Sequence, residues 1–304
     1  LDYSGRINHN KQKNANKGSF PHGGAGRILS FQKKMEKPLE RKQNRMDQNR
    51  MPLVEALQQF REEAPAYFRI PGHRFERGLD EALNGASLAA YDLSEAEGLD
   101  DLHHAEGVIA EAQRLAAETW KAKKTFFLVN GTTCGNEAMV LSSVKEGEKI
   151  IVPRNVHKSV LMGLILCGAT PVYVMPEYST KWQMWGGVTP ETIEKAFAET
   201  PDAKAVLLVS PTYYGLCSDL QAIAEICHCH NAALLVDEAH GSHLYFSEQL
   251  PLGALESGAD ACAQSIHKTA GSFTQSSFLS LGSGRLDEAR VAANLQMVQS
   301  TSPS

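Results

Sequence analysis

The feature that most constrains the fold of this chain is the alternation, from about residue 105 onward, of short apolar segments with amphipathic ones. Segments such as "VLLVS" and "ALLVD" are apolar at nearly every position, which is typical of strands covered by helices on both faces. Segments such as "EGVIAEAQRLAAETWKA" carry apolar residues at helical spacing. This alternation predicts an α/β fold, a three-layer αβα sandwich with a mostly parallel sheet.

The expected elements can be placed by residue range. Strands are expected at 125–129, 149–153, 171–175, 203–210 and 232–239, with shorter ones at 259–265 and 276–282. Helices are expected at 106–122, 130–144, 157–169, 189–199 and 218–230, and another is expected to begin near Asp287. Thr189 and Pro190 suit the cap and first position of their helix, and Gly168 suits a helix end.

Charge divides the chain into two parts. Residues 1–50 carry 12 Lys and Arg against 4 Asp and Glu, a balance of +8, whereas the remainder carries 18 against 31, a balance of −13. Residues 1–45 are polar and show no apolar periodicity, so we expect a disordered basic tail. A transit peptide or a nucleic-acid-binding arm is the alternative interpretation. We expect an N-terminal segment at 46–104 and a major domain at 105–304.

The cysteines and the hydropathy of the chain indicate where the protein is found and what it binds. The six cysteines form no CxxC pair, which favours a reduced protein of the cytoplasm. "CHCH" at 227–230 resembles a metal-binding pattern, but it lies in an expected helix where Cys227 and Cys229 face different sides. We therefore predict no metal site. No apolar run approaches about 18 residues, and we expect neither a membrane nor a nucleic acid as partner.

Polar segments follow the expected strands at their carboxyl ends. "NGTTCGN" follows 125–129, "RNVHKS" follows 149–153, "PTYYG" follows 203–210, "DEAHGSH" closes 232–239 and "SIHKT" follows 259–265. Parallel sheets bind ligands beyond the carboxyl ends of their strands. The sequence therefore predicts a ligand site at this edge.

Three of these segments allow both a functional and a structural interpretation. "NGTTCGN" places a glycine and the Thr132 and Thr133 hydroxyls at the start of a helix, as in a phosphate-binding turn or an ordinary helix start. Asp237, at the end of an apolar strand, either binds a protonated ring nitrogen or caps a loop. His157 either lies flat against a planar ring or is a solvated loop residue.

Lys268 stands in a run with little other charge, since every residue of 261–277 except His267 and Lys268 is uncharged. An isolated lysine indicates burial or function, because a partly desolvated amine loses its proton readily and can attack a carbonyl. Ser265 and His267 either donate to an anion or satisfy a turn. A phosphate-binding turn, a flat side chain, a secluded lysine and Asp237 together indicate pyridoxal phosphate.

The chain from about 52 to 300 resembles the major domain of the Orn/Lys/Arg decarboxylase class-I family, within the aspartate-aminotransferase-like, fold-type I pyridoxal phosphate enzymes. Seven motifs in order carry the resemblance: "FRIPGH" (68–73), "GVIAEAQ" (107–113), "LVNGTTCGN" (128–136), "PRNVHKS" (153–159), "SPTYYG" (210–215), "VDEAHGSH" (236–243) and "QSIHKT" (264–269). Ile266 stands where the family usually has threonine.

The resemblance implies a role for each site residue. Lys268 would form the Schiff base and Asp237 would bind the pyridine nitrogen. His157 would stack on one face of the ring and Ala239 would pack on the other, with Lys268 and His157 catalytic. The phosphate would be held by Thr132, Thr133, Ser265, His267 and the Cys134 backbone N–H. His240 would lie near the phenolic oxygen, and Thr212 would line the pocket.

The resemblance also implies an activity: decarboxylation of arginine, lysine or ornithine to the amine and carbon dioxide, by a homodimer or higher homo-oligomer. The family's smaller C-terminal domain is expected to be missing, since the chain stops at "MVQSTSPS". Another pyridoxal reaction, transamination or lysis, stays open, although neither Arg285 nor Arg290 has a recognisable carboxylate-binding context. A non-catalytic truncated paralogue also stays open. The acidic segment "YDLSEAEGLDD" either faces a basic substrate or is a solvated loop.

Overall fold

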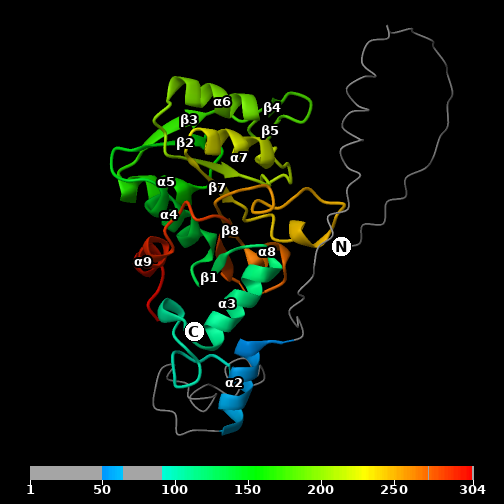
Figure 1. Ribbon diagram of the computed structural model, residues 1–304. Coiled ribbons are helices and arrows are strands. Elements are labelled where there is room, and N and C mark those ends of the chain that lie inside the picture. The colour runs from blue at the N-terminus through cyan, green and yellow to red at the C-terminus, as the bar shows by residue number, and fades with distance from the viewer. Residues whose placement is uncertain (1–49, 64–90, 273, 303–304) are drawn as a thin grey trace, which may run out of the picture. The chain divides into compact units, whose positions relative to one another are not determined.

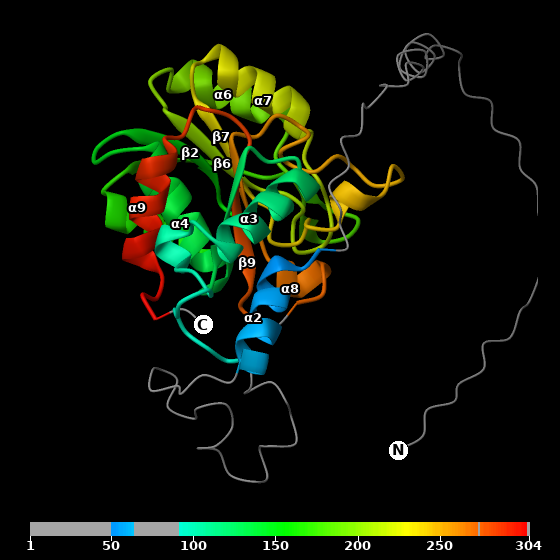
Figure 2. The same cartoon turned by 60° about the horizontal axis from the view of Figure 1, so that its bottom comes forward.

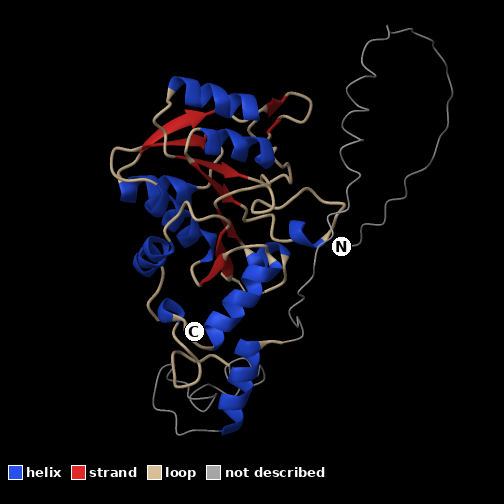
Figure 3. Ribbon diagram, in the orientation of Figure 1, coloured by secondary structure: helices blue, strands red, loops and turns tan. Residues whose placement is uncertain are grey.

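A seven-stranded sheet forms the middle layer of the fold (Figures 1 and 3). The computed structural model describes residues 50–63, 91–272 and 274–302. The expected tail at 1–45 and the "FRIPGH" motif at 68–73 lie outside these residues. The strands of the sheet are β1 (Lys124–Leu128), β2 (Lys149–Pro153), β3 (Thr170–Val174), β6 (Ala205–Val209), β7 (Ala233–Asp237), β8 (Ala261–Gln264) and β9 (Ser277–Leu281).

The sheet is mostly parallel, as predicted. Its strand order is β1-β9-β8-β7-β6-β2-β3, and β2 pairs in parallel with β3 and β6, β6 with β7, and β7 with β8. Among the described strands of this sheet, β9 alone runs the other way, antiparallel to both β1 and β8. The carboxyl ends of β1, β2, β6, β7 and β8 therefore lie on one edge.

Helices cover both faces of the sheet. They are α2 (Pro52–Glu63), α3 (Val108–Thr119), α4 (Gly131–Ser143), α5 (Lys158–Cys167), α6 (Pro190–Glu199), α7 (Leu220–Cys229), α8 (Ile266–Thr269) and α9 (Glu288–Val298). Short 3-10 turns lie at Leu102–His104 and Leu244–Phe246. Figure 2 shows α6 and α7 on one side of the strands and α4 and α9 on the other.

Two apolar clusters, one on each face, make this a three-layer α/β sandwich. In β6, Ala205 and Leu207 belong to the cluster that contains residues of α4, α5 and α9, whereas Val206 and Leu208 belong to the cluster of α6 and α7. This division follows from the pleat, because successive side chains of a strand point to opposite faces. The unbroken apolar runs in the sequence are thereby explained.

The predicted helix ends are confirmed. The Thr189 hydroxyl accepts a hydrogen bond from the Thr192 N–H, with Pro190 at the first position of α6. Gly168 ends α5 with φ 70°, a left-handed conformation that favours glycine. Cys227 is buried and Cys229 is exposed, so the two thiols of "CHCH" face different sides of α7, as expected.

Some features were not predicted. A two-stranded hairpin of β4 (Tyr178–Ser179) and β5 (Met184–Trp185) follows β3. Lys268 lies in the short helix α8, for which no helix was predicted. Within the described ranges, every helix is too short or too polar to span a bilayer.

Candidate active site

A cavity of about 560 Å³ lies at the carboxyl edge of the sheet. Seven of the predicted site residues line it: Thr132, His157, Thr212, Asp237, Ala239, His240 and Lys268. The other lining residues are Asn155, Val156, Lys158, Trp185, Val209, Tyr213 and Tyr214. The volume is in the range of small-molecule sites. The cavity thus collects residues that follow β1, β2, β6, β7 and β8.

Asp237 is the last residue of β7 and is only 3% exposed. Its Oδ2 accepts a hydrogen bond of 2.8 Å from Asn136 Nδ2, and its Oδ1 accepts one of 3.2 Å from the Ala239 N–H. Burial raises the pKa of Asp237, against the opposing effects of these donors and of the charges at His157 and Lys268. A buried carboxylate at a cavity wall is suited to bind a cationic group of a ligand.

Asn136 in α4 was missed by the sequence reasoning, although it ends the "NGTTCGN" motif. Its side chain is buried, and Nδ2 also donates to Ser159 Oγ at 3.0 Å. One sequence signal could have identified it: Asn136 lies on the helical stretch that continues as "EAMVLSS". A polar side chain buried in such a helix needs hydrogen-bond partners. The sequence did not show that one of those partners would be Asp237.

His157 caps the start of α5. Its Nδ1 accepts a hydrogen bond from the Ser159 N–H at 3.2 Å and lies 2.8 Å from Ser159 Oγ. The ring is exposed and lines the cavity. His157 is therefore neither a free loop residue nor a buried one, since its ring is anchored along one edge.

Lys268 lies beside His240, with 3.3 Å between Lys268 Nζ and His240 Nε2. Burial, followed by the charge of Lys268, lowers the pKa of His240, which favours a neutral imidazole next to the amine. The expectation that Lys268 is secluded was wrong for this chain, in which Lys268 is exposed. The physical reason is its place on the four-residue helix α8, at the rim of an open cavity.

The residues expected to bind phosphate are only partly brought together. Thr132 Oγ1 lies 3.2 Å from Ser265 Oγ, which joins the start of α4 to the residue before α8. Thr133 is exposed and does not line the cavity. The buried Cys134 thiol donates to the Gly131 carbonyl, and burial raises its pKa to about 11, so only its backbone is suited to an anion.

His267 also stands outside the cavity lining. Its Nδ1 lies 3.0 Å from the Ser276 carbonyl oxygen. A carbonyl only accepts, so Nδ1 carries the hydrogen. The ring is thus turned toward the loop between α8 and β9.

Glu238, next to Asp237, is fully buried and was also missed. Its carboxylate accepts hydrogen bonds from the Ala254 N–H at 2.7 Å, and from Tyr245 Oη and Gln264 Nε2 at 2.8 Å each. Burial raises its pKa to about 7, although these donors oppose the shift. Adjacent strand residues point to opposite faces, so Glu238 lies behind the cavity wall rather than on it.

Two carboxylates of the acidic segment bind the backbone at the start of α3 and in the 3-10 turn before it. The Asp100 carboxylate accepts hydrogen bonds from the backbone N–H groups of Asp101, Glu106, Gly107, Ile109 and Ala110. Partial burial opposes the effect of these donors, yet the pKa of Asp100 is lowered. Asp101 accepts from the His103 and His104 N–H groups. These two carboxylates are therefore structural.

The architecture is that of solved lysine decarboxylases. Lysine decarboxylase A from Pseudomonas aeruginosa matches with a TM-score of 0.72 and 27% identity, covering 83% of this chain and 38% of that one. The lysine decarboxylase LdcF from Francisella novicida matches with a TM-score of 0.71 at 22% identity, which shows the fold. A mostly parallel sheet with this carboxyl-edge cavity thus places the chain in an α/β class that includes amino-acid decarboxylases.

The chain belongs to the Orn/Lys/Arg decarboxylase family, whose major domain matches residues 51–304. It is 44% identical over 260 residues to an arginine decarboxylase of Halalkalibacterium halodurans, covering 84% of this chain and 53% of that protein. It is 42% identical over 262 residues to an arginine decarboxylase of Bacillus subtilis, covering 85% and 54%. The chain spans about half the length of these curated relatives.

Proposed function

We propose that this chain carries the pyridoxal phosphate site of a decarboxylase that acts on a basic amino acid. The observation that carries the proposal is the presence of Asp237 and Lys268 in one cavity at the carboxyl edge of the sheet. Family membership supports decarboxylation as the reaction.

The residues of the cavity fit pyridoxal phosphate by their chemistry. The buried Asp237 carboxylate suits a protonated ring nitrogen, and the exposed amine of Lys268 is accessible to a carbonyl. The hydroxyls of Thr132 and Ser265, next to the start of α4, suit a phosphate. A side chain able to lie flat on a ring, His157, lines the same cavity.

Pyridoxal phosphate, when bound, supplies a sink for the electrons of the bond that breaks at Cα. In this chain Asp237 would hold a proton on the ring nitrogen, and Lys268 would hold the cofactor covalently. The Lys268 amine would also be the group that returns a proton to Cα. His157 and Ala239 would contact the ring.

The remaining site residues bind and orient. Thr132, Ser265 and the Cys134 N–H would hold the phosphate. Thr133 and His267, which do not line the cavity, would also contact it only if their side chains turned toward it. His240, whose pKa is lowered by burial and by the charge of Lys268, lies next to Lys268 and would contact the phenolic oxygen. Thr212 lines the cavity.

The two arginines that follow Lys268 in this sequence are held away from the cavity. Arg290 Nη2 donates to the Leu141 and Val144 carbonyls, and Arg285 pairs with Asp260. Neither lines the cavity, so neither is placed to bind a substrate α-carboxylate there.

Arginine is the first substrate to test, because the relatives at 44% and 42% identity are named arginine decarboxylases. We further propose a cytoplasmic homodimer, in which the partner subunit covers the open side of the cavity beside Lys268.

The test is a product assay on the purified chain with pyridoxal phosphate and arginine, lysine or ornithine in turn. We expect carbon dioxide and the matching amine from one of them, and neither from Lys268→Ala. A keto acid in place of the amine would indicate transamination. Cofactor binding without either product would support a non-catalytic paralogue.

A further inference from the structure

One hydrogen-bonded chain links two parts of the cavity wall. Asn136 Nδ2 lies 2.8 Å from Asp237 Oδ2 and 3.0 Å from Ser159 Oγ, and Ser159 Oγ lies 2.8 Å from His157 Nδ1. Asn136 and Ser159 are each 1% exposed and Asp237 is 3% exposed, so water has little access to the contacts among these three side chains. The chain therefore connects β7, α4 and the start of α5.

The donor direction at His157 follows from the helix cap. The Ser159 backbone N–H can only donate, and it donates to His157 Nδ1. Nδ1 therefore carries no hydrogen, and the Ser159 hydroxyl must also donate to it. The hydrogen of the imidazole consequently lies on Nε2.

The direction at Asn136 follows from its acceptors. The lone pairs of Ser159 Oγ and the carboxylate of Asp237 both accept, so they use the two amide hydrogens of Asn136. Turning the amide over would set Asn136 Oδ1 against the Asp237 carboxylate. The amide orientation and the tautomer of His157 are thus consistent with each other.

We propose that Asn136 and Ser159 are positioning residues that hold the Asp237 carboxylate in place and fix His157 in the tautomer with hydrogen on Nε2. The inference rests on the proposed function, since a fixed imidazole plane matters when the ring stacks on a cofactor. A ring whose plane and tautomer are set beforehand loses little further freedom on binding.

The first test reads the tautomer without any cofactor. Two-bond ¹H–¹⁵N correlation spectra of the ¹⁵N-histidine-labelled chain distinguish hydrogen on Nε2 from hydrogen on Nδ1. His157→Gln identifies the His157 signal among the 11 histidines. We expect hydrogen on Nε2 in the parent chain and in Ser159→Thr, which keeps the hydroxyl. In Ser159→Ala the 2.8 Å contact with the hydroxyl is lost and only the longer 3.2 Å backbone N–H donor remains, so we expect part of the population to carry hydrogen on Nδ1.

The second test measures pyridoxal phosphate affinity by fluorescence titration. Asn136→Ala removes a hydrogen bond to a carboxylate, so we expect binding about tenfold weaker. The matched control is Ser142→Ala, also in α4, which removes the buried hydroxyl that accepts from Asn294. The control should keep both the His157 tautomer and the affinity of the parent, while thermal unfolding checks that each variant folds.

The outcomes separate this inference from the proposed function. Hydrogen on Nδ1 in the parent, or an unchanged tautomer in Ser159→Ala, would overturn the inference whether or not the cofactor binds. Equal affinities of the parent and Asn136→Ala would also overturn it. A parent that binds no pyridoxal phosphate yet shows hydrogen on Nε2, changed in Ser159→Ala, would instead contradict the proposed function.

Discussion

The ionisation of Glu238 is linked to folding. Its carboxyl group is fully buried, and its pKa is raised from 4.5 to about 7 by burial. The folded chain then binds a proton more tightly than the unfolded chain between these two pH values. This proton therefore stabilises the folded chain fully below pH 4.5, and its contribution is lost as pH rises through about 7. The free energy of unfolding falls by on the order of 3 kcal/mol over this range.

Glu238→Gln should flatten this dependence, because an amide does not titrate. The Gln264 amide can turn over to accept from the new side chain, since Gln264 Oε1 now has no hydrogen-bond partner. The measurement is urea unfolding at several pH values between 4.5 and 8. Glu199→Gln, at an exposed position, is the matched control and should keep the slope of the parent. Equal slopes for the parent and Glu238→Gln would contradict the assignment.

Residue-level prediction from sequence succeeded where a side chain directly follows a strand. Thr132, His157 and Asp237 line one cavity because parallel strands end at one edge. Asn136 was missed because its role depends on a partner 101 residues away. The expectation that Lys268 is secluded was wrong, because a lack of charged neighbours in the sequence does not determine whether a side chain is buried.

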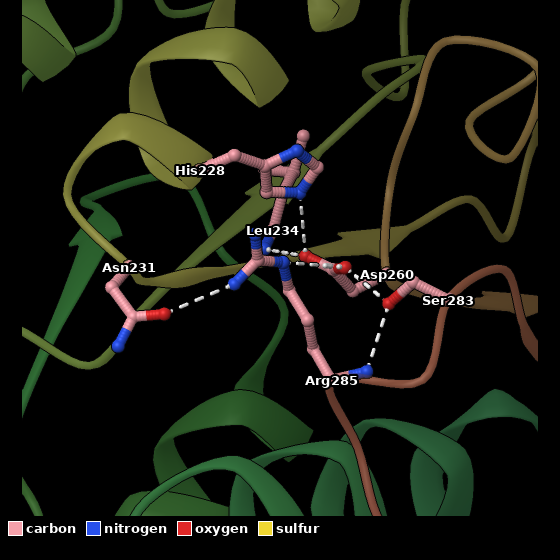
Figure 4. A network of polar contacts seen from close by, with 6 residues as sticks. All are labelled: His228, Asn231, Leu234, Asp260, Ser283 and Arg285. Carbon is pink, nitrogen blue, oxygen red and sulfur yellow. Dashed lines mark hydrogen bonds and ion pairs between the residues drawn. The ribbon is translucent and has the colours of Figure 1, made fainter.

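At the scale of elements, Asp260 ties together the edge of the sheet opposite the cavity (Figure 4). Its Oδ2 accepts from the Leu234 N–H at 2.7 Å and lies 3.1 Å from His228 Nε2. Its Oδ1 lies 3.5 Å from Arg285 Nε and also accepts from the Ser283 hydroxyl. One carboxylate thereby joins α7, β7 and the segment that follows β9.

Asp260→Ala should destabilise the fold by roughly 3 kcal/mol, because it leaves a buried N–H and an arginine without their acceptor. The measurement is the free energy of unfolding in urea. Asp202→Ala is the control, since Asp202 forms an exposed pair with Lys149 and should change the stability far less than Asp260→Ala. Similar costs for the two variants would show that the Asp260 contacts contribute little.

The order of elements was predictable because each strand and helix has its own apolar period. Expected and observed bounds of β2 are identical, at 149–153. The reversed direction of β9 was not predictable, because an apolar segment of five residues carries no sign of its orientation. The β4–β5 hairpin has two residues in each strand, too few for a detectable period.

At the scale of the whole molecule, exposed aromatic side chains stand at the cavity. Tyr213 is 80% exposed, Tyr214 is 61% exposed and Trp185 is 42% exposed, and all three line the cavity. Aromatic residues are enriched at protein interfaces. These side chains are the surface that the partner would cover in the proposed homodimer.

The parent chain should therefore sediment as a dimer, and the double variant Tyr213→Glu, Tyr214→Glu should dissociate at least about tenfold more readily. Sedimentation velocity over a range of concentrations measures both. Met297→Glu, which places a charge at an exposed apolar position on α9, should leave the dimer unchanged. A parent that sediments as a monomer at every concentration would exclude the proposed dimer.

The most direct test of the account is the visible absorbance spectrum of the purified chain with pyridoxal phosphate. Covalent binding of the cofactor by a lysine gives a visible band, and the cavity contains two lysines, Lys158 and Lys268. We expect the band in the parent and in Lys158→Ala, and no band in Lys268→Ala. A band that survives in Lys268→Ala, or one that is absent from the parent, would contradict it.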